Sequence, residues 1–182
     1  VNIDNDPFPN FFGTSAAAPH AAAVAALLLD AKHKYNNGET FTGPQMKSLL
    51  QTTAIDMYTP GYDVESGFGF VQADKALQTF SNPVPQVSGI ELQDSAFAPG
   101  ADPVTVVISG EYFSGNASVI FQYDTIPGTL VGDSQIVVNI PPFLGNPPLT
   151  VYNPPLVNGV DGGSSDSLYL LSSLPTNITV AV

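Results

Sequence analysis

A serine that precedes an alanine-rich run is the residue of this 182-residue sequence best placed to do chemistry. Ser15 follows Gly13 and Thr14, and the alanines and leucines of residues 16–29 favour a helix. Backbone N–H groups at a helix start have no partner within the helix, and the positive end of its dipole lies there. An oxyanion formed beside Ser15 would therefore be stabilised, although the hydroxyl needs a separate base before it can act as a nucleophile.

The neighbours of Ser15 fit the same arrangement. Gly13 permits a tight turn into the helix without a side chain that would block a substrate. We expect Pro19 to lie in the first turn, where a missing N–H costs little. His20 and His33 are expected to be packing and surface residues, because one points away from the serine along the same helix and the other lies about five turns further on.

Three helices are predicted around this serine. The first covers about residues 15–35 and ends at 36–38 (Asn-Asn-Gly), which is a favourable C-cap. The second begins at 42–44 (Thr-Gly-Pro), a short third covers 71–80, and the turn sequences of 58–69 predict a loop. The residues expected in the core are Met46, Leu49, Leu50, Phe68 and Phe70.

The first helix is apolar on every side from Ala16 to Leu29, which is typical of a central helix in a larger domain. A unit of about 80 residues cannot cover all of its faces. We therefore expect that a preceding segment is missing, and that residues 1–82 expose apolar surface and self-associate.

Three stretches of this first part resemble subtilisin-like serine proteases (subtilases). Residues 12–20 (Phe-Gly-Thr-Ser-Ala-Ala-Ala-Pro-His) are similar to the nucleophile motif of that family. Residues 46–54 (Met-Lys-Ser-Leu-Leu-Gln-Thr-Thr-Ala) and 67–73 (Gly-Phe-Gly-Phe-Val-Gln-Ala) match it in the same order. The resemblance covers about residues 8–80.

This resemblance implies that Ser15 is the catalytic nucleophile, that its backbone N–H forms half of the oxyanion hole, and that Gly13, Thr14 and Pro19 support the motif. The family's aspartate and histidine precede its serine along the chain. Only 14 residues precede Ser15, and none of them is histidine. The chain therefore resembles a C-terminal fragment of a catalytic domain that lacks the triad Asp and His and is inactive alone. Its substrate would be a protein or peptide, and no cofactor or metal is implied.

The composition changes after Asn82, where a Pro-Val-Pro segment suggests a domain boundary. Residues 1–82 hold all 4 lysines, whereas residues 83–182 hold no basic residue and 12 of the 17 prolines. We predict a subtilisin-like part at 1–82, a second domain at 83–174, and the start of a further, truncated β segment at 175–182.

The second domain is predicted to consist of strands. Apolar and polar residues alternate along residues 104–109, 119–121, 136–140, 149–151 and 168–171, and Pro127-Gly128 suits a type II turn. The pattern resembles an immunoglobulin-like TIG (IPT) domain. The predicted fold is thus multidomain: a helical C-terminal piece of an α/β subtilisin-like domain followed by an all-β immunoglobulin-like sandwich.

Composition excludes several classes of function. A net charge of −12 without arginine argues against nucleic-acid binding and against docking on an anionic membrane. No continuous apolar run reaches about 20 residues, so no transmembrane segment is expected. The absence of cysteine excludes disulfides and thiol sites. The acidic segments at Asp4/Asp6 and Asp161/Asp166 have the oxygens for a hard cation, but solvated turns are the preferred interpretation.

Two functions remain after these exclusions. The first is a fragment of a secreted or surface-bound subtilisin-like endopeptidase. The alternative is a non-enzymatic extracellular adhesion, binding or spacer module built on the immunoglobulin-like domain. In that alternative Tyr112, Tyr123 and Tyr152 would form a face for a carbohydrate or protein ligand, although a spacer is the preferred role.

Overall fold

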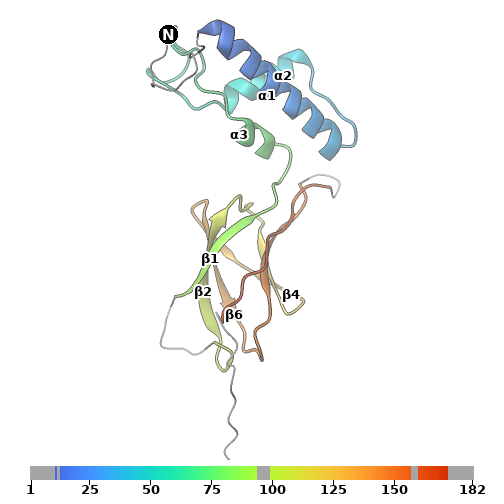
Figure 1. Ribbon diagram of the computed structural model, residues 1–182, viewed down its shortest axis with the longest axis vertical. Helices are drawn as coiled ribbons and strands as arrows, with labels where there is room; N and C mark the ends of the chain where they lie inside the picture. Colours follow the sequence, from blue (N-terminus) through green and yellow to red (C-terminus); the bar gives the residue numbers. More distant parts are fainter. Residues whose placement is uncertain (1–10, 12, 94–98, 157–159, 172–182) are drawn as a thin grey trace, which may run out of the picture. The chain divides into compact units, whose positions relative to one another are not determined.

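The computed structural model describes residue 11 and residues 13–93, 99–156 and 160–171. The chain divides into two compact units, Val1–Phe80 and Ser81–Val182. The first contains helices and the second contains β-strands (Figure 1). The predicted β segment at 175–182 and the acidic turn of Asp4 and Asp6 lie outside the described residues.

The first unit contains α1 (Thr14–Tyr35), α2 (Gly43–Thr52) and α3 (Ala73–Gln78). α1 ends as predicted, because Asn37 has a positive φ of 54° and the N–H of Gly38 donates to the carbonyl of His33 at 2.9 Å. The predicted start of α2 is also confirmed: the N–H of Thr42, which precedes the helix, donates to the Gln45 side chain at 2.8 Å.

α3 is shorter than the predicted range of 71–80. Phe70 and Ile55 exchange two backbone hydrogen bonds of 2.8 Å each, so the chain is still extended where the helix was expected to begin. Gln72 also has an extended backbone, with φ −117° and ψ 105°. The helix therefore starts only at Ala73.

The core of the helical unit is small. Its buried residues are Leu28 on α1, Met46 on α2, Ala76 on α3 and Phe80 just after α3. The core prediction was right for Met46 and wrong for Phe68 and Phe70, whose side chains are 45% and 63% exposed. Leu27 on α1 is 66% exposed, so the expected apolar exposure is present, and self-association stays a prediction.

α1 is long and apolar enough to cross a membrane, judged by length and composition alone. Core helices of soluble proteins and signal sequences meet the same criterion, so this property is weak evidence of a membrane span. The expectation of no transmembrane segment therefore stays a prediction.

The second unit contains two antiparallel four-stranded sheets, ordered β1-β2-β6-β5 and β4-β3-β7-β8. The strands are β1 (Gln86–Leu92), β2 (Val104–Glu111), β3 (Ser118–Phe121), β4 (Asp124–Pro127), β5 (Thr129–Val131), β6 (Gln135–Ile140), β7 (Leu149–Asn153) and β8 (Gly163–Ser164).

Alternating apolar side chains from both sheets form one core. Val106 on β2 and Ile140 on β6 are fully buried, as are Val119 on β3 and Leu149 on β7. The four strands predicted between 104 and 151 are confirmed. The predicted strand at 168–171 is wrong, since this segment contributes only an isolated bridge between Leu168 and Leu149.

The predicted type II turn at Pro127-Gly128 is also wrong. That turn needs a positive φ at its glycine, and Gly128 has none. A steric contact explains why the residue is glycine: a Cβ at Gly128 would lie only 2.4 Å from Cγ2 of Ile136. The position needs glycine because the backbone passes close to a core side chain.

Candidate functional site

Ser15 is the second residue of α1, and its side chain is exposed. The N–H groups of Ala16 and Ala17 both donate to the carbonyl of Gly13 at 3.0 Å and so close the first turn. Among the residues that the structure describes, no carbonyl accepts the backbone N–H of Ser15. An exposed hydroxyl thus lies beside an available N–H at the positive end of a 22-residue helix.

The turn that precedes the helix requires glycine. Gly13 has φ 95° and ψ −176°, a conformation that residues with a Cβ rarely adopt. A Cβ at this position would have no described atom within 4 Å. Backbone conformation therefore explains the glycine next to Thr14.

The prediction that Pro19 lies in the first turn is wrong. The helix begins at Thr14, so Pro19 is its sixth residue and lies inside it. An amide there would donate to the carbonyl of Ser15, four residues earlier, and proline cannot. The proline therefore removes a helical hydrogen bond from the peptide group of the candidate nucleophile itself.

Neither histidine is placed to act as a base for Ser15. Nδ1 of His20 forms a hydrogen bond with the carbonyl of Ala16 at 2.7 Å, which holds the ring against its own helix. His33 is exposed near the far end of α1. The described residues therefore bring together the serine and its helix N-terminus but no base.

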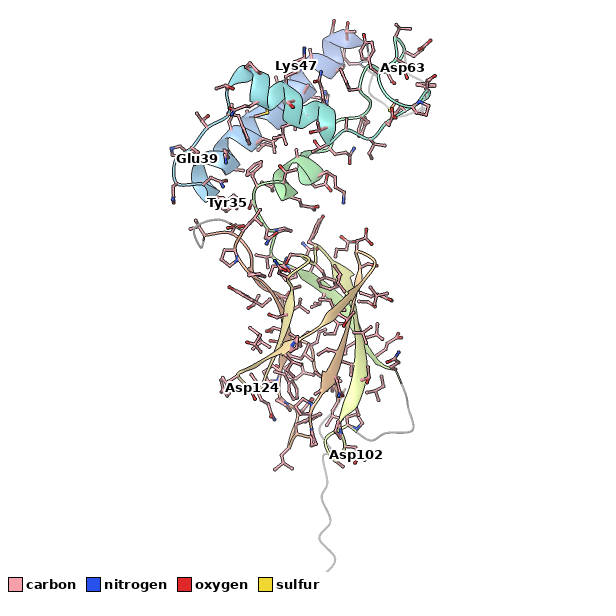
Figure 2. All side chains as sticks on the ribbon, turned by 180° about the vertical axis from the view of Figure 1, so that it is seen from behind. Tyr35, Glu39, Lys47, Asp63, Asp102 and Asp124 are labelled. Carbon is pink, nitrogen blue, oxygen red and sulfur yellow. The ribbon has the colours of Figure 1, made fainter. Side chains whose placement is uncertain are left out.

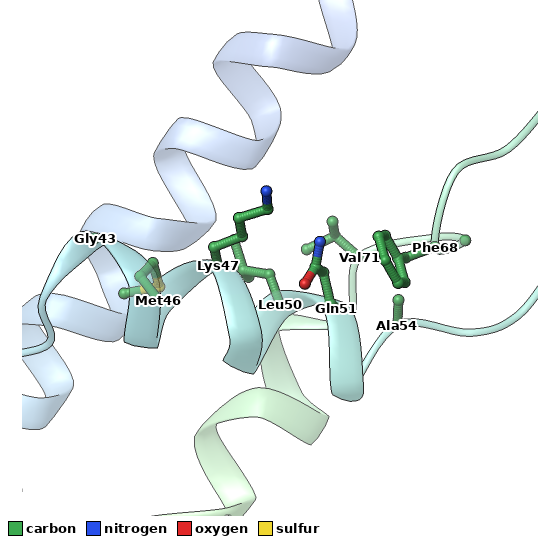
Figure 3. Close-up of a pocket in the computed structure, with 9 residues that line it drawn as sticks. Gly43, Met46, Lys47, Leu50, Gln51, Ala54, Phe68 and Val71 are labelled. Atoms are coloured by element: carbon green, nitrogen blue, oxygen red, sulfur yellow. The ribbon is translucent and has the colours of Figure 1, made fainter. Parts of the chain in front are cut away.

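An apolar hollow of about 380 Å³ lies beside α2 in the same unit. Figure 3 shows Met46, Lys47 and Leu50 of α2 on one side and Phe68 and Val71 on the other. Ser15 does not line the hollow, and neither does any histidine, aspartate or glutamate. Lys47 is the one ionisable side chain among the described residues that line the hollow, and nothing there pairs it with Ser15.

The loop after α2 is held by Asp63 (Figure 2). Its Oδ1 accepts the N–H of Ser66 at 2.6 Å and the N–H of Glu65 at 3.0 Å. The bond from the Ser66 backbone is the largest cause that holds the pKa of Asp63 below its usual value, since it stabilises the ionised carboxylate. These bonds give the carboxylate a structural role in the loop.

In the β unit the three tyrosines do not form one face. Tyr152 on β7 lies opposite Ser118 at the start of β3, and Leu149 lies opposite Phe121 at the end of that strand. Tyr123 follows β3 and is fully exposed, so it lies beyond the opposite end of the strand from Tyr152. The predicted ligand face of Tyr112, Tyr123 and Tyr152 is therefore not continuous.

Sequence reasoning missed the most heavily bonded side chain of the β unit. Asn153 is fully buried, and its Oδ1 accepts the N–H of Ser114 at 3.0 Å. Its Nδ2 donates to the carbonyls of Pro83 at 2.8 Å and Tyr112 at 2.7 Å. Tyr112 has φ 62°, so the bond also holds a left-handed backbone conformation. An asparagine at the end of a strand, before two prolines, gives no signal of this role in the sequence.

The described residues contain no group of three or more histidine, cysteine or acidic side chains that would hold a metal ion. The preferred interpretation of Asp161 and Asp166 as a solvated turn is right for Asp166, which is exposed. It is wrong for Asp161, which is only 8% exposed.

Comparison with known proteins addresses the first unit. Residues 2–84 match the model of the Subtilase family. A stretch of 79 residues is 40% identical to Fervidolysin from Fervidobacterium pennivorans and covers 43% of this chain and 10% of that relative. The chain thus spans about a tenth of the length of that relative, and no solved structure matches it significantly. The N-terminal segment is therefore subtilisin-like, as its serine motif indicated, and the similarity supports a serine protease parent.

Proposed function

We propose that Ser15 is the nucleophile of a subtilisin-like serine endopeptidase and that this chain carries the C-terminal part of the catalytic domain. One observation carries the proposal: an exposed serine is the second residue of a 22-residue helix, inside a segment that matches the subtilase family. Its hydroxyl would attack the scissile carbonyl, and its free N–H would donate to the resulting oxyanion.

The catalytic base must come from outside these 182 residues. The chain has two histidines, both C-terminal to Ser15 on the same helix, and the triad order of this family places histidine before serine. Aspartate, histidine and the second oxyanion-hole donor would be supplied by a preceding catalytic portion, and the whole enzyme would act on proteins or peptides outside the cell or at its surface.

For the β unit we propose an immunoglobulin-like fold of the TIG type that serves as a spacer. The sheet orders β1-β2-β6-β5 and β4-β3-β7-β8 support it, because they correspond to the A-B-E-D and C′-C-F-G orders of immunoglobulin domains. The separation of Tyr123 from Tyr152 favours the spacer over the alternative, an adhesion module that binds a ligand through a tyrosine face.

The isolated 182-residue chain is expected to hydrolyse no protein substrate, because neither of its two histidines is placed to accept the proton of the Ser15 hydroxyl. The measurement is release of fluorescent peptides from labelled, unfolded casein, with Ser15→Ala as the matched control. Both chains should give the same background. A rate for the unmodified chain clearly above that of the variant would show that the base lies within this sequence.

A further inference from the structure

Asp161 is a buried carboxylate in the loop between β7 and β8. Its Oδ2 accepts the N–H of Asn82 at 2.7 Å and the N–H of Leu156 at 2.9 Å. Its Oδ1 is buried as well, and no donor in the described part of the chain reaches it. A carboxylate offers about four acceptor positions on its two oxygens. One oxygen of Asp161 is therefore fully partnered, and the other is enclosed without a partner.

The negative charge of the carboxylate raises the free-energy cost of leaving Oδ1 of Asp161 without a partner. Residues 83–182 contain no lysine, arginine or histidine, so no side chain of this segment can neutralise the carboxylate. An ionised group removed from water is costly unless it pairs with an opposite charge or binds a metal. Since the β unit has no basic side chain of its own, a cation from solution would supply the positive charge.

Two backbone carbonyl oxygens lie close to Gly162, the residue after Asp161. Gly162 has φ 73°, and a Cβ there would lie 2.4 Å from the carbonyl oxygen of Asn153 and 3.1 Å from that of Pro154. The two carbonyl oxygens thus lie against the residue that follows the carboxylate, and that of Pro154 already accepts the side-chain N–H of Asn82 at 2.8 Å. Carboxylate and carbonyl oxygens are the ligands that hard cations prefer, and calcium tolerates their irregular arrangement better than magnesium does.

We propose that Oδ1 of Asp161 binds a hard cation of the calcium class, with water completing its coordination. A site with a single carboxylate is weak, so the dissociation constant should lie in the range of about 0.1–1 mM that is typical of extracellular modules. Bound cation would hold the loop of Asp161 against Asn82 and stabilise the β unit.

The test is calorimetric unfolding of the whole 182-residue chain in about 10 mM calcium chloride and in chelator. Sodium chloride keeps the ionic strength equal, because any salt screens a net charge of −12. Calcium at this concentration should raise the unfolding temperature of the β unit by about 6–20 °C, as a dissociation constant of about 0.1–1 mM implies. Asp161→Asn should remove this rise, and Asp166→Asn, a matched change at the exposed aspartate of the same segment, should keep it. Equal temperatures in calcium and chelator, or a full rise in Asp161→Asn, would overturn the proposal.

A second measurement serves if Asp161→Asn does not fold. In a calcium titration of the unmodified chain followed by amide NMR, the largest shifts should fall on Asn82, Leu156 and Gly162 with one common midpoint. Shifts spread over the acidic surface, with these three amides unchanged, would mean that calcium only screens the charge of the chain.

Discussion

Replacement of Ser15 by alanine in the complete protease is expected to lower kcat for peptide hydrolysis by about 10⁶-fold. The change removes the hydroxyl that would form the acyl-enzyme, and it keeps the backbone N–H and the helix start. Alanine also favours the helix at this position, so the variant should fold. Steady-state kinetics with a fluorogenic peptide measure the effect, and substrate affinity should change little because the hydroxyl acts on the reacting carbonyl.

Ser48→Ala is the matched control for that experiment. Ser48 is an exposed serine on α2, and its carbonyl, rather than its side chain, accepts the hydroxyl of Thr52 at 3.0 Å. This variant should keep the full rate. If Ser15→Ala retained more than about a hundredth of the rate, Ser15 would be a helix-capping residue and the nucleophile would lie elsewhere.

Asn153→Ala should destabilise the β unit by about 4 kcal/mol, the second large effect that we predict. The substitution leaves the N–H of Ser114 and the carbonyls of Pro83 and Tyr112 without their buried partner. It also opens a cavity at a fully buried position and releases the left-handed backbone of Tyr112. Urea unfolding of the chain, followed by tyrosine fluorescence of the β unit, measures the change.

Asn139→Ala provides the comparison for this prediction. Asn139 lies on β6 with its side chain exposed, so the same substitution there should cost less than about 1 kcal/mol. A loss of similar size at both positions would mean that β propensity, rather than the buried hydrogen bonds of Asn153, sets the effect.

Local patterns predicted the elements whose signals lie within a few residues. The alanine-rich run predicted α1 and the Asn-Asn-Gly sequence predicted its end, because propensity and capping act over one or two turns. The alternation of apolar and polar residues likewise predicted β2 and β6, since each strand buries every second side chain in the shared core.

Features set by distant contacts could not be read in this way. Gly128 is required by the side chain of Ile136 on another strand, and β1, which starts the sheet, has a register shift that interrupts its alternation. Asp161 is likewise buried beside Asn82, 79 residues away, whose N–H it accepts. For the candidate site, the position of Ser15 at a helix start was predictable from the alanine-rich run. The source of its base was not predictable, because both histidines follow Ser15 on the same helix.

Covalent labelling would identify the activated serine of the protease. The complete protease would be treated with a fluorophosphonate, which reacts with an activated serine, and its peptides would be mapped by mass spectrometry alongside those of the isolated 182-residue chain. We expect one rapid adduct, on Ser15, in the complete protease, and labelling of Ser15 no faster than of other serines in the isolated chain. An adduct on a different serine of the complete protease would mean that Ser15 is not the nucleophile.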